Sequence, residues 1–344
     1  MQKKKVKKIL SMLALSAFSM SMVVGCGGND KPANTEQAEN TENYNIGIVQ
    51  LVTHGALDAA NQGFVKGLAD NGFVEGENIT ISQQNAQGEQ SNLQSIAQQF
   101  LSSEVDLICA IATPAAQVMA SATEEIPIVG TAITDYVSAN LVNSNEKPGL
   151  NVTGTSDMNP IRDQVDLLLQ LAPDTKTIGI IYTSSEVNSQ IQVEEVKTYA
   201  KELNINVVEA TVSNVNDIQQ AAQSLVGKAD AIYLPTDNNI ASAVPQLVSI
   251  TDEAGLITVC GAEDMINDGG TATYGIDYYK LGYQTGVMAA KILKGEATPA
   301  EMPIQFAETA DLSVTINQDA VDSLGITVPA ELAEKAKMVT NKVE

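Results

Sequence analysis

The first half of the chain alternates short apolar runs with longer segments in which apolar side chains recur every three or four positions. The short runs are rich in β-branched residues, which is typical of strands, and the longer segments have the spacing of amphipathic helices. This pattern predicts strands over 45–50, 79–83, 107–111 and 127–130, helices over 56–71 and 90–102, and a further helix that opens at Pro114. Strands that alternate with helices indicate a parallel sheet.

The same order begins again at Lys176. The second half is predicted to contain strands over 177–182, 206–211, 231–234 and 256–260, and helices over 189–203, over 216–225 and after Asp237. The stretch DLICAIATPAA from Asp106 matches DAIYLPTDNN from Asp230 in its buried strand and its Thr/Pro turn into a helix. The repeat predicts an α/β protein with two doubly wound parallel sheets and right-handed crossovers.

Beyond Cys260 the pattern adds the segment TATYGID, a long helix over 278–294, the segment IQFAETADLSVTI and a last short helix. An extra helix and strand after two complete cycles indicate that the chain crosses between the lobes more than once, which makes a hinge. The predicted first lobe is 44–154 plus 277–300, and the predicted second lobe is 155–276 plus 301–340.

The N-terminal segment has the features of a signal peptide over residues 1–25. Five lysines precede Ile9, and the apolar run from Ile9 to Val24 is too short and too serine-rich for a membrane span. The run ends in VVGC, which resembles the bacterial lipobox and implies a lipid on Cys26; a plain secreted protein with a chance cysteine is the alternative. Residues 26–43 then form a flexible tether with almost no apolar side chains.

Charge changes the picture once the signal peptide is set aside. Its removal takes away five lysines and no acid, which leaves 14 basic side chains against 42 acidic ones and a net charge of about −28. So acidic a surface argues against nucleic acid or an anionic membrane as a partner. It fits a soluble body, expected to be a monomer, that a lipid anchor holds at the cell membrane.

The rarer residue types weigh against catalysis. His54 is the only histidine and no Cys–His cluster occurs, so no metal site is expected. Neither a Gly-x-Ser-x-Gly motif nor a phosphate-binding loop is present, and we expect no catalytic residue and no cofactor. Cys109 and Cys260 lie in apolar runs of different halves, which favours two buried thiols over a disulfide.

Ligands of open parallel sheets bind beyond the carboxyl ends of the strands, and two facing sheets bring both sets of loops to one cleft. Each polar residue there is, taken alone, more often a cap or turn residue, and it is the shared position that marks a site. The candidates are Gln50, His54, Thr113, Pro114, Ala115, Thr134, Asp135, Tyr136, Ser156, Asp157, Ser184, Ser185, Glu186, Asn188, Thr236, Asp237, Asn238, Glu263 and Asp277.

Several strings carry a family resemblance: NAQGEQSNLQSIAQQF, AIATPAAQ, IPIVGTAITD, NVTGTSD, IYTSSEVNS, YLPTDN and GIDYYKLGYQTG–AAKILKGE. In order and spacing, across about residues 46–312, the chain resembles the ABC-transporter substrate-binding lipoproteins of the tryptophan/tyrosine-binding type. The resemblance implies a type I periplasmic-binding fold, an aromatic L-amino acid as ligand, and an ABC permease and ATPase as partners. The chain departs from the family at Tyr136, where proline is frequent.

An amino acid ligand gives the candidates roles. The helix that opens at Thr113 can hold the carboxylate through its free N–H groups, although an ordinary N-cap is the alternative. The only arginine, Arg162, is a second carboxylate partner, with pairing to a neighbouring aspartate (Asp163 or Asp166) equally expected. The ammonium is assigned to Asp237, unless that residue only caps the helix at Asn238.

The sequence offers several aromatic side chains for the ligand's ring. Tyr136 and Tyr182 end strands at the expected cleft, whereas Tyr233 and Phe64 are expected in the cores. His54 is expected either to contact the ligand's side chain or to face solvent. Two other functions stay open at this point: a binder of another small solute such as a sugar, and a surface adhesion lipoprotein.

Overall fold

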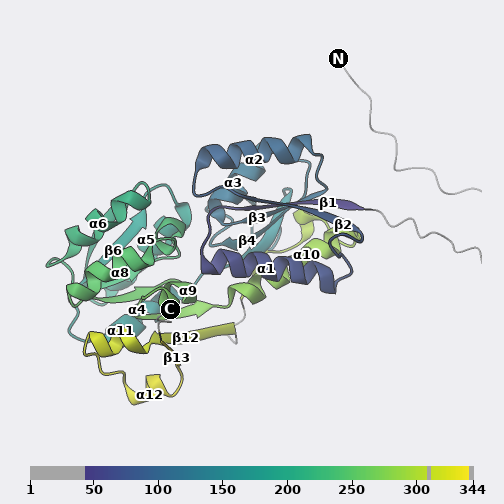
Figure 1. The fold of residues 1–344 in the computed structure, drawn as a ribbon. Coiled ribbons are helices and arrows are strands. Elements are labelled where there is room, and N and C mark those ends of the chain that lie inside the picture. Colours follow the sequence, from purple (N-terminus) through teal and green to yellow (C-terminus); the bar gives the residue numbers. More distant parts are fainter. Residues whose placement is uncertain (1–42, 308–310, 341–344) are drawn as a thin grey trace, which may run out of the picture. The chain divides into compact units, whose positions relative to one another are not determined.

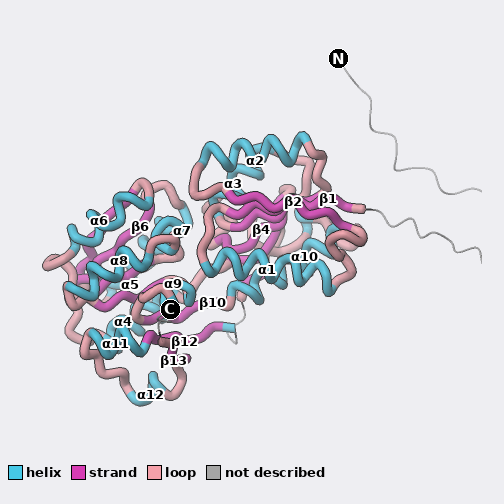
Figure 2. Tube along the Cα trace, in the orientation of Figure 1, coloured by secondary structure: helices cyan, strands magenta, loops and turns pink. Residues whose placement is uncertain are grey.

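The computed structural model describes residues 43–307 and 311–340. The predicted signal peptide, Cys26 and nearly all of the tether lie outside these ranges. The described chain forms two sheets, each flanked by helices (Figures 1 and 2). The prediction of two doubly wound, mainly parallel sheets is confirmed.

The first sheet is parallel throughout, in the order β11-β5-β4-β3-β1-β2. Its strands are β1 (Tyr44–Gln50), β2 (Ile79–Asn85), β3 (Leu107–Ile111), β4 (Ile128–Ile133), β5 (Val152–Ser156) and β11 (Gln305–Phe306). The helices of this lobe are α1 (Gly55–Asp70), α2 (Gln90–Ser102), α3 (Thr113–Ala122) and α10 (Tyr278–Leu293), and a 3-10 turn, η2, covers Pro299–Glu301.

The second sheet has the order β13-β12-β10-β9-β8-β6-β7, with one antiparallel pair, β10 with β12. Its strands are β6 (Thr177–Thr183), β7 (Asn206–Val212), β8 (Ala231–Leu234), β9 (Ile257–Cys260), β10 (Ala272–Ile276), β12 (Leu312–Asn317) and β13 (Lys337–Val339). Its helices are α4 (Ile161–Leu171), α5 (Val187–Glu202), α6 (Ile218–Leu225), α7 (Asn238–Ala241), α8 (Val244–Glu253), α9 (Glu263–Asn267), α11 (Gln318–Ser323) and α12 (Ala330–Ala333), and a 3-10 turn, η1, covers Val215–Asp217.

The internal repeat extends to individual hydrogen bonds. In both sheets the first strand of the cycle lies between the second and the third, so each sheet reverses its direction of growth beside that strand. Asp106, just before β3, accepts a hydrogen bond from the backbone N–H of Asn45 at 2.7 Å. Asp230, just before β8, does the same for Lys176 and Thr177 at 2.9 Å. One carboxylate thus ties the starts of two neighbouring strands together in each lobe.

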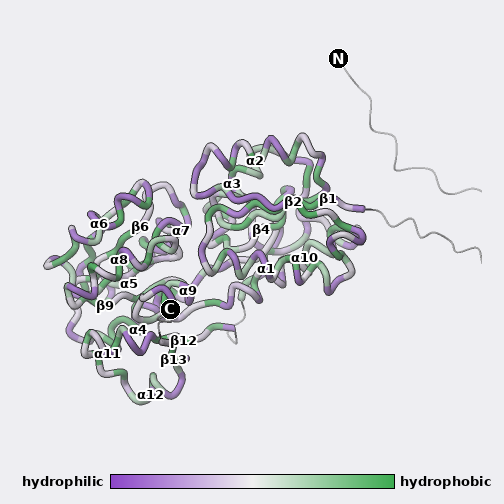
Figure 3. Tube along the Cα trace, in the orientation of Figure 1, coloured by the Kyte–Doolittle hydropathy of each residue, from purple (hydrophilic) through white to green (hydrophobic). Residues whose placement is uncertain are grey.

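The central strands are buried on both faces because helices cover both sides of a parallel sheet. Every residue of β3 and β8 is buried, and the apolar segments gather on the strands within each lobe (Figure 3). Cys109 and Cys260 are free, buried thiols in different sheets, as predicted. Phe64 and Tyr233 are fully buried, which confirms their assignment to the cores.

The chain passes between the sheets three times: from β5 to α4, from β10 to α10, and from β11 to β12. β11 pairs with β5, and both belong to the first sheet. The first sheet therefore includes Thr155, Ser156 and residues 305–306, which the predicted boundaries assigned to the second lobe. The short strand at 305–306 has too little apolar pattern to reveal its sheet from sequence.

Helices α1 and α10 lie side by side although more than 200 residues separate them (Figure 1). Glycines allow the two backbones to touch. A Cβ at Gly282 would lie 1.9 Å from the carbonyl oxygen of Ala60, and a Cβ at Gly286 would lie 2.3 Å from that of Phe64. This contact fixes the start of α10, and with it Tyr278, against the first lobe.

Replacing Gly282 by alanine is expected to lower the free energy of unfolding by at least about 2 kcal/mol, because the added methyl forces two helix backbones apart. The loss should appear despite alanine's better helix propensity, which is worth about 1 kcal/mol. Urea unfolding measures the change. Lys291→Ala, at an exposed position of α10, is the matched control and should stay within about 0.5 kcal/mol of the parent. Equal stability of the two variants would contradict the close packing.

Candidate functional site at the boundary between the lobes

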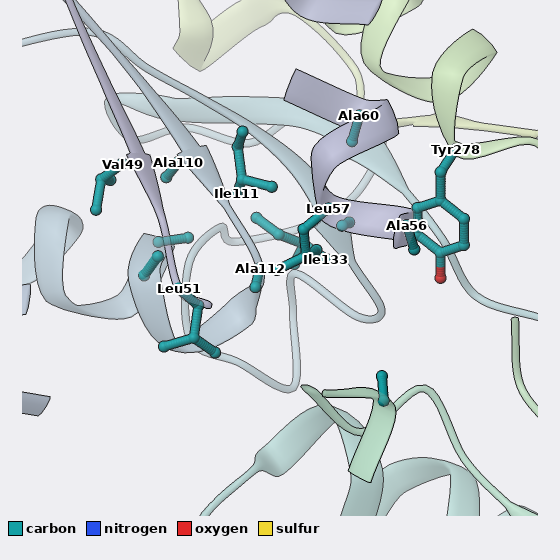
Figure 4. Close-up of a cluster of buried hydrophobic side chains, with 14 of the residues drawn as sticks. Val49, Leu51, Ala56, Leu57, Ala60, Ala110, Ile111, Ala112, Ile133 and Tyr278 are labelled. Carbon is teal, nitrogen blue, oxygen red and sulfur yellow. The ribbon is translucent and has the colours of Figure 1, made fainter. Parts of the chain in front are cut away.

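A small cavity lies between the carboxyl ends of the two sheets and takes its walls from both lobes. Its volume is about 20 Å³, which is room for about one water molecule. Figure 4 shows Ala56, Leu57 and Tyr278, three of the apolar and aromatic side chains on the first-lobe side. The lining residues are His54, Ala56, Leu57, Ala132, Thr134, Asp157 and Tyr278 from that lobe and Asn188, Thr236, Asp237, Asn238, Ala241, Ala262 and Met265 from the other.

The first-lobe strands end in unusual backbone conformations beside this cavity. Ala112, directly after β3, has φ 86°, and Ala132, near the end of β4, has φ 55°. Positive φ is rare for residues with a side chain, and such strain tends to collect where a chain holds a ligand. The pairing of β4 with β5 also shifts its register between Gly130 and Ile133. Both irregularities occur at the strand ends where the sequence predicted a site.

Asp157, directly after β5, is a buried acid of the cavity wall with hydrogen-bonding capacity to spare. Its Oδ1 accepts a hydrogen bond from the Thr134 hydroxyl at 3.0 Å, and its Oδ2 accepts one from the Tyr278 hydroxyl at 2.7 Å. Burial raises the pKa of this carboxyl, and the two hydroxyl donors offset only part of that effect. Each oxygen keeps a lone pair, because a carboxylate can accept about four hydrogen bonds.

Asp237 reaches the same cavity, but its carboxylate is saturated. Oδ1 accepts from the Thr183 hydroxyl and from the backbone N–H of Ile240, and Oδ2 accepts from the backbone N–H of Thr183 and from the Ser189 hydroxyl. All four distances lie between 2.6 and 3.0 Å. The arrangement argues against the ammonium role predicted for Asp237. It matches the alternative, an N-cap of α7 that also fixes the β6–α5 loop.

Glu186 lies behind the second-lobe wall and organises two asparagines that line it. Its Oε2 accepts hydrogen bonds from the side-chain amide of Asn188 at 2.9 Å and from both the backbone and side-chain N–H of Asn238. Burial, and then the nearby charge of Asp237, raise the pKa of Glu186 to about 7. Asn188 in turn presents a buried side-chain oxygen that finds no hydrogen-bond partner among the described residues.

One set of contacts joins the two lobes directly. The Nδ1 of His54 lies 3.0 Å from Oδ2 of Asp264, and its Nε2 lies 3.3 Å from the side-chain oxygen of Asn238. The same Asp264 oxygen accepts the backbone N–H of Ala56 at 3.0 Å. Both ring nitrogens of His54 are therefore engaged by the second lobe, which places the histidine neither in solvent nor free to contact a ligand side chain.

Several other predicted residues end strands or begin a helix without forming the cavity wall. Thr113, Pro114 and Ala115 begin α3, and the Thr113 hydroxyl is buried with no hydrogen-bond partner among residues 43–307 and 311–340. Ser156 donates to the backbone oxygen of Thr134. Gln50 is buried and donates to Val52 O and Asp58 Oδ1. These residues shape the loops that carry the wall.

Other predicted residues do not line the cavity, and most of their side chains have local partners. Asp135 closes its own turn, Ser184 donates to Val212 O, Ser185 is exposed, Glu263 pairs with Lys337, and Asp277 caps α10. The Tyr136 hydroxyl donates to Thr155 O inside the first core, and Tyr182 donates to Glu209 at the far edge strand. Arg162 pairs with Glu202 and Glu195 rather than with Asp163 or Asp166.

The sequence pattern did not indicate the apolar wall or one polar partner, Tyr278. Ala56, Leu57, Ala132, Ala241, Ala262 and Met265 look like any core residues along the chain. Tyr278 directly follows the candidate Asp277, whereas Asp264 was expected at the cleft together with Glu263. Successive residues of a helix point in directions about 100° apart around its axis. At the start of a helix, only one of two neighbouring residues can therefore face the other lobe, and the sequence pattern did not show which one.

Two doubly wound lobes with a shared cavity at their strand ends and three crossings define a two-lobed binding protein. Residues 45–340 match the family model described as ABC transporter substrate binding protein. The chain belongs to this family of extracytoplasmic substrate-binding proteins. None of the helices in the described ranges combines the length and apolar character that a membrane span requires.

Three relatives are informative. The chain is 43% identical over 323 residues to a tyrosine-binding protein of Clostridioides difficile (strain R20291), which covers 93% of each chain. A Streptococcus pneumoniae ABC domain in complex with L-Trp is 40% identical with a TM-score of 0.83. The ligand-free, open structure of a substrate binding protein with adhesive properties from Clostridium difficile is 44% identical with a TM-score of 0.67. Both structures cover 87% of this chain and are themselves covered completely. The type I periplasmic-binding fold is thereby confirmed.

Asp237→Asn is expected to lower the free energy of unfolding by about 2–3 kcal/mol. The new amide would point an N–H at donors that cannot all turn away, and hydrogen bonds to a charged acceptor are lost. Asp135→Asn is the control and should change stability by less than about 0.5 kcal/mol, because asparagine accepts the same local turn bonds. Chemical denaturation of the ligand-free protein measures the free energy of unfolding of both variants. An Asp237→Asn protein of normal stability that has lost ligand affinity would restore Asp237 to the ammonium role.

Proposed function

We propose that this chain is the extracytoplasmic solute-binding lipoprotein of an ABC importer and that it holds an aromatic L-amino acid in the interlobe cavity. The observation that carries the proposal is Asp157, a buried carboxylate at the cavity with unused lone pairs; the wall contains neither lysine nor arginine, and its His54 is engaged by Asp264. A buried charge without a counter-charge is costly. A ligand ammonium supplies that charge.

Asn188 faces the cavity from the opposite lobe and completes the ammonium site. Its NH₂ group donates to Glu186 Oε2 at 2.9 Å and to Thr236 O at 3.0 Å, so the orientation of the amide is fixed by two acceptors. The unpartnered oxygen then remains for a donor in the cavity. An ammonium carries three donors, and Asp157 with Asn188 offers acceptors from both lobes.

The ligand carboxylate is assigned to the start of α3. Free N–H groups and the positive end of a helix favour an anion there, and the buried Thr113 hydroxyl lacks a partner among the described residues. Helix α3 contacts α5 of the other lobe, so this helix lies at the boundary between the lobes. Arg162 is not needed, because it is half exposed and held by Glu202 and Glu195.

The ligand's ring is assigned to the apolar part of the wall, where Leu57, Met265 and the ring of Tyr278 provide contact area. An aromatic amino acid is larger than the cavity, so the side chains of the wall must rearrange to admit it. The TM-score is higher for the L-Trp complex than for the ligand-free, open relative, although its sequence identity is lower. The names of the relatives support an aromatic ligand.

A thermal-shift panel of amino acids and sugars tests the function. Tyrosine, tryptophan or phenylalanine should stabilise the protein, by about 2.7 kcal/mol at 100 times Kd, whereas sugars should not. Asp157→Asn is expected to weaken binding at least tenfold, about 1.4 kcal/mol, because the ammonium loses its counter-charge. Asp135→Asn serves as the control with parental affinity. Stabilisation by a sugar alone, or full affinity in Asp157→Asn, would overturn the assignment.

Attachment to the membrane is proposed to depend on the sulfur of Cys26, with the protein acting as a monomer. Cys26→Ala should abolish lipid attachment and move the protein from the detergent-soluble membrane fraction to the soluble fraction. Mass spectrometry of the mature N-terminus checks the modification directly. Ligand affinity should not change, since the binding lobes begin after the tether. Unaltered membrane retention of the alanine variant would refute the anchor.

A further inference from the structure

The contacts of Asp264 differ in kind from those of the other buried acids. Asp264 belongs to α9 of the second lobe, yet its Oδ2 accepts from His54 and from the backbone N–H of Ala56, both in the first lobe. Ala56 lies in the first turn of α1, a helix of 16 residues whose own N-cap residue, His54, makes no capping hydrogen bond. A carboxylate from one lobe thus caps a helix of the other.

The glycine at position 55 allows the two lobes to approach closely beside Asp264. A Cβ at Gly55 would lie 2.7 Å from Cβ of Asp264, so a side chain there would push the lobes apart. Helices α1 and α9 are in contact across the boundary. The side chains of His54 and Asp264 are only 7% and 10% exposed, so water screens their attraction little. Each of these interactions is lost when the lobes separate.

We infer that Asp264 and His54 form an interlobe latch that stabilises the closed protein when His54 is protonated and thereby makes ligand capture pH-dependent. The inference rests on the proposed function, because it describes how the same cleft closes. Asp264 acts as a positioning residue: it lies outside the cavity wall and affects the ligand only through His54 and the start of α1. His54 and Asn238 transmit the contact to that wall.

The charges around His54 all favour its protonated form. Asp264 on α9 faces Nδ1, Glu186 lies behind Asn238 at the start of α5, Asp157 lies at the end of β5, and Asp268 follows α9. Tyr278 at the start of α10 binds Asp157. Burial alone would lower the pKa of His54, but the hydrogen bond and charge of Asp264 outweigh it and the pKa is raised. Burial would raise the pKa of Asp264, and His54 lowers it.

The direction of the pH effect follows from this raised pKa. In the open protein His54 meets water and returns toward its ordinary value of about 6.5. A group whose pKa is higher in the closed form stabilises that form while protonated. The contribution is complete below the open-state pKa and is lost as the pH rises through the closed-state pKa. Ligand affinity should therefore fall as the pH rises from 5.5 to 8.5.

Calorimetric titration of the full mature chain with L-tyrosine and with L-tryptophan tests the latch. Measurements at pH 5.5, 7 and 8.5, in two buffers of different ionisation enthalpy, give both affinity and the number of protons taken up. The parent protein should bind at least about threefold more tightly at pH 5.5 than at 8.5 and should take up protons at pH 7. His54→Gln and Asp264→Asn should lose both properties and should approach the parent affinity at pH 8.5.

Two further variants separate the latch from neighbouring acids. Glu186 titrates in the same range, because its pKa is raised to about 7, and Glu186→Gln should keep the pH dependence that belongs to His54. Glu263→Gln changes the residue next to Asp264, whose partner Lys337 is in the same lobe, and should behave like the parent. If Asp264→Asn does not fold, His54→Gln carries the test.

The outcomes are distinct. Absence of binding of either amino acid at every pH would refute the proposed function itself. Binding with pH-independent affinity and no proton uptake would refute the latch and leave the proposed function standing. A pH dependence that survives in His54→Gln but disappears in Glu186→Gln would assign the titration to Glu186 and overturn the role of Asp264.

Discussion

The cost of burying a carboxylate decides what each acid at the lobe boundary can do. Asp237 is saturated by four donors of its own lobe and is structural. Glu186 is held by asparagine amides and backbone N–H groups, and it sets the orientation of Asn188. Asp264 accepts hydrogen bonds from the other lobe, so these contacts require the lobes to be close together. Asp157 alone of these four combines a place in the cavity wall with unused acceptor capacity. The donors around each acid therefore support the proposed roles: Asp237 and Glu186 as scaffold, Asp264 as latch and Asp157 as the ligand-binding acid.

The fold explains how such a site exists with almost no basic side chains. Parallel strands that alternate with helices point strand carboxyl ends and helix N-termini at the same edge, and both sheets of this chain do so. Free N–H groups at helix N-termini then replace lysine and arginine as hydrogen-bond donors to carboxylates. The start of α7 donates to Asp237 and Glu186, and the start of α1 donates to Asp264. The start of α3 remains for an anion from outside. An acidic chain can therefore bind a zwitterion without an arginine in its cleft.

Sequence patterns predicted the strands and helices well because β-branched runs and 3.6-residue spacing reflect burial in each lobe. They also selected residues that line the cavity: His54, Asn188 and Asp237 follow predicted strands, and Asp157 was expected at the first crossing between the lobes. The roles of these residues were harder to predict from the sequence. The donors that saturate Asp237 come from positions 183, 189 and 240 and meet only in the folded chain. Tyr136 follows a strand as the site residues do, yet its ring turns into the core beneath Gly130 and Gly154. Position along the chain predicts an edge of the sheet, not which way a side chain points from it.

The same physics gives the cleft a means of discrimination. In the site proposed above, a ligand ammonium would cancel the charge of Asp157 and satisfy the Asn188 oxygen, so closure over it would leave neither group unpaired. A sugar or an oxo acid brings no positive charge, and closure over either would leave Asp157 desolvated without compensation. Burial raises the pKa of Asp157, so protonation is the other way to relieve the buried charge. In the proposed site, neutral solutes are therefore disfavoured without a steric barrier, by an acid that the protein buries without a cationic partner of its own.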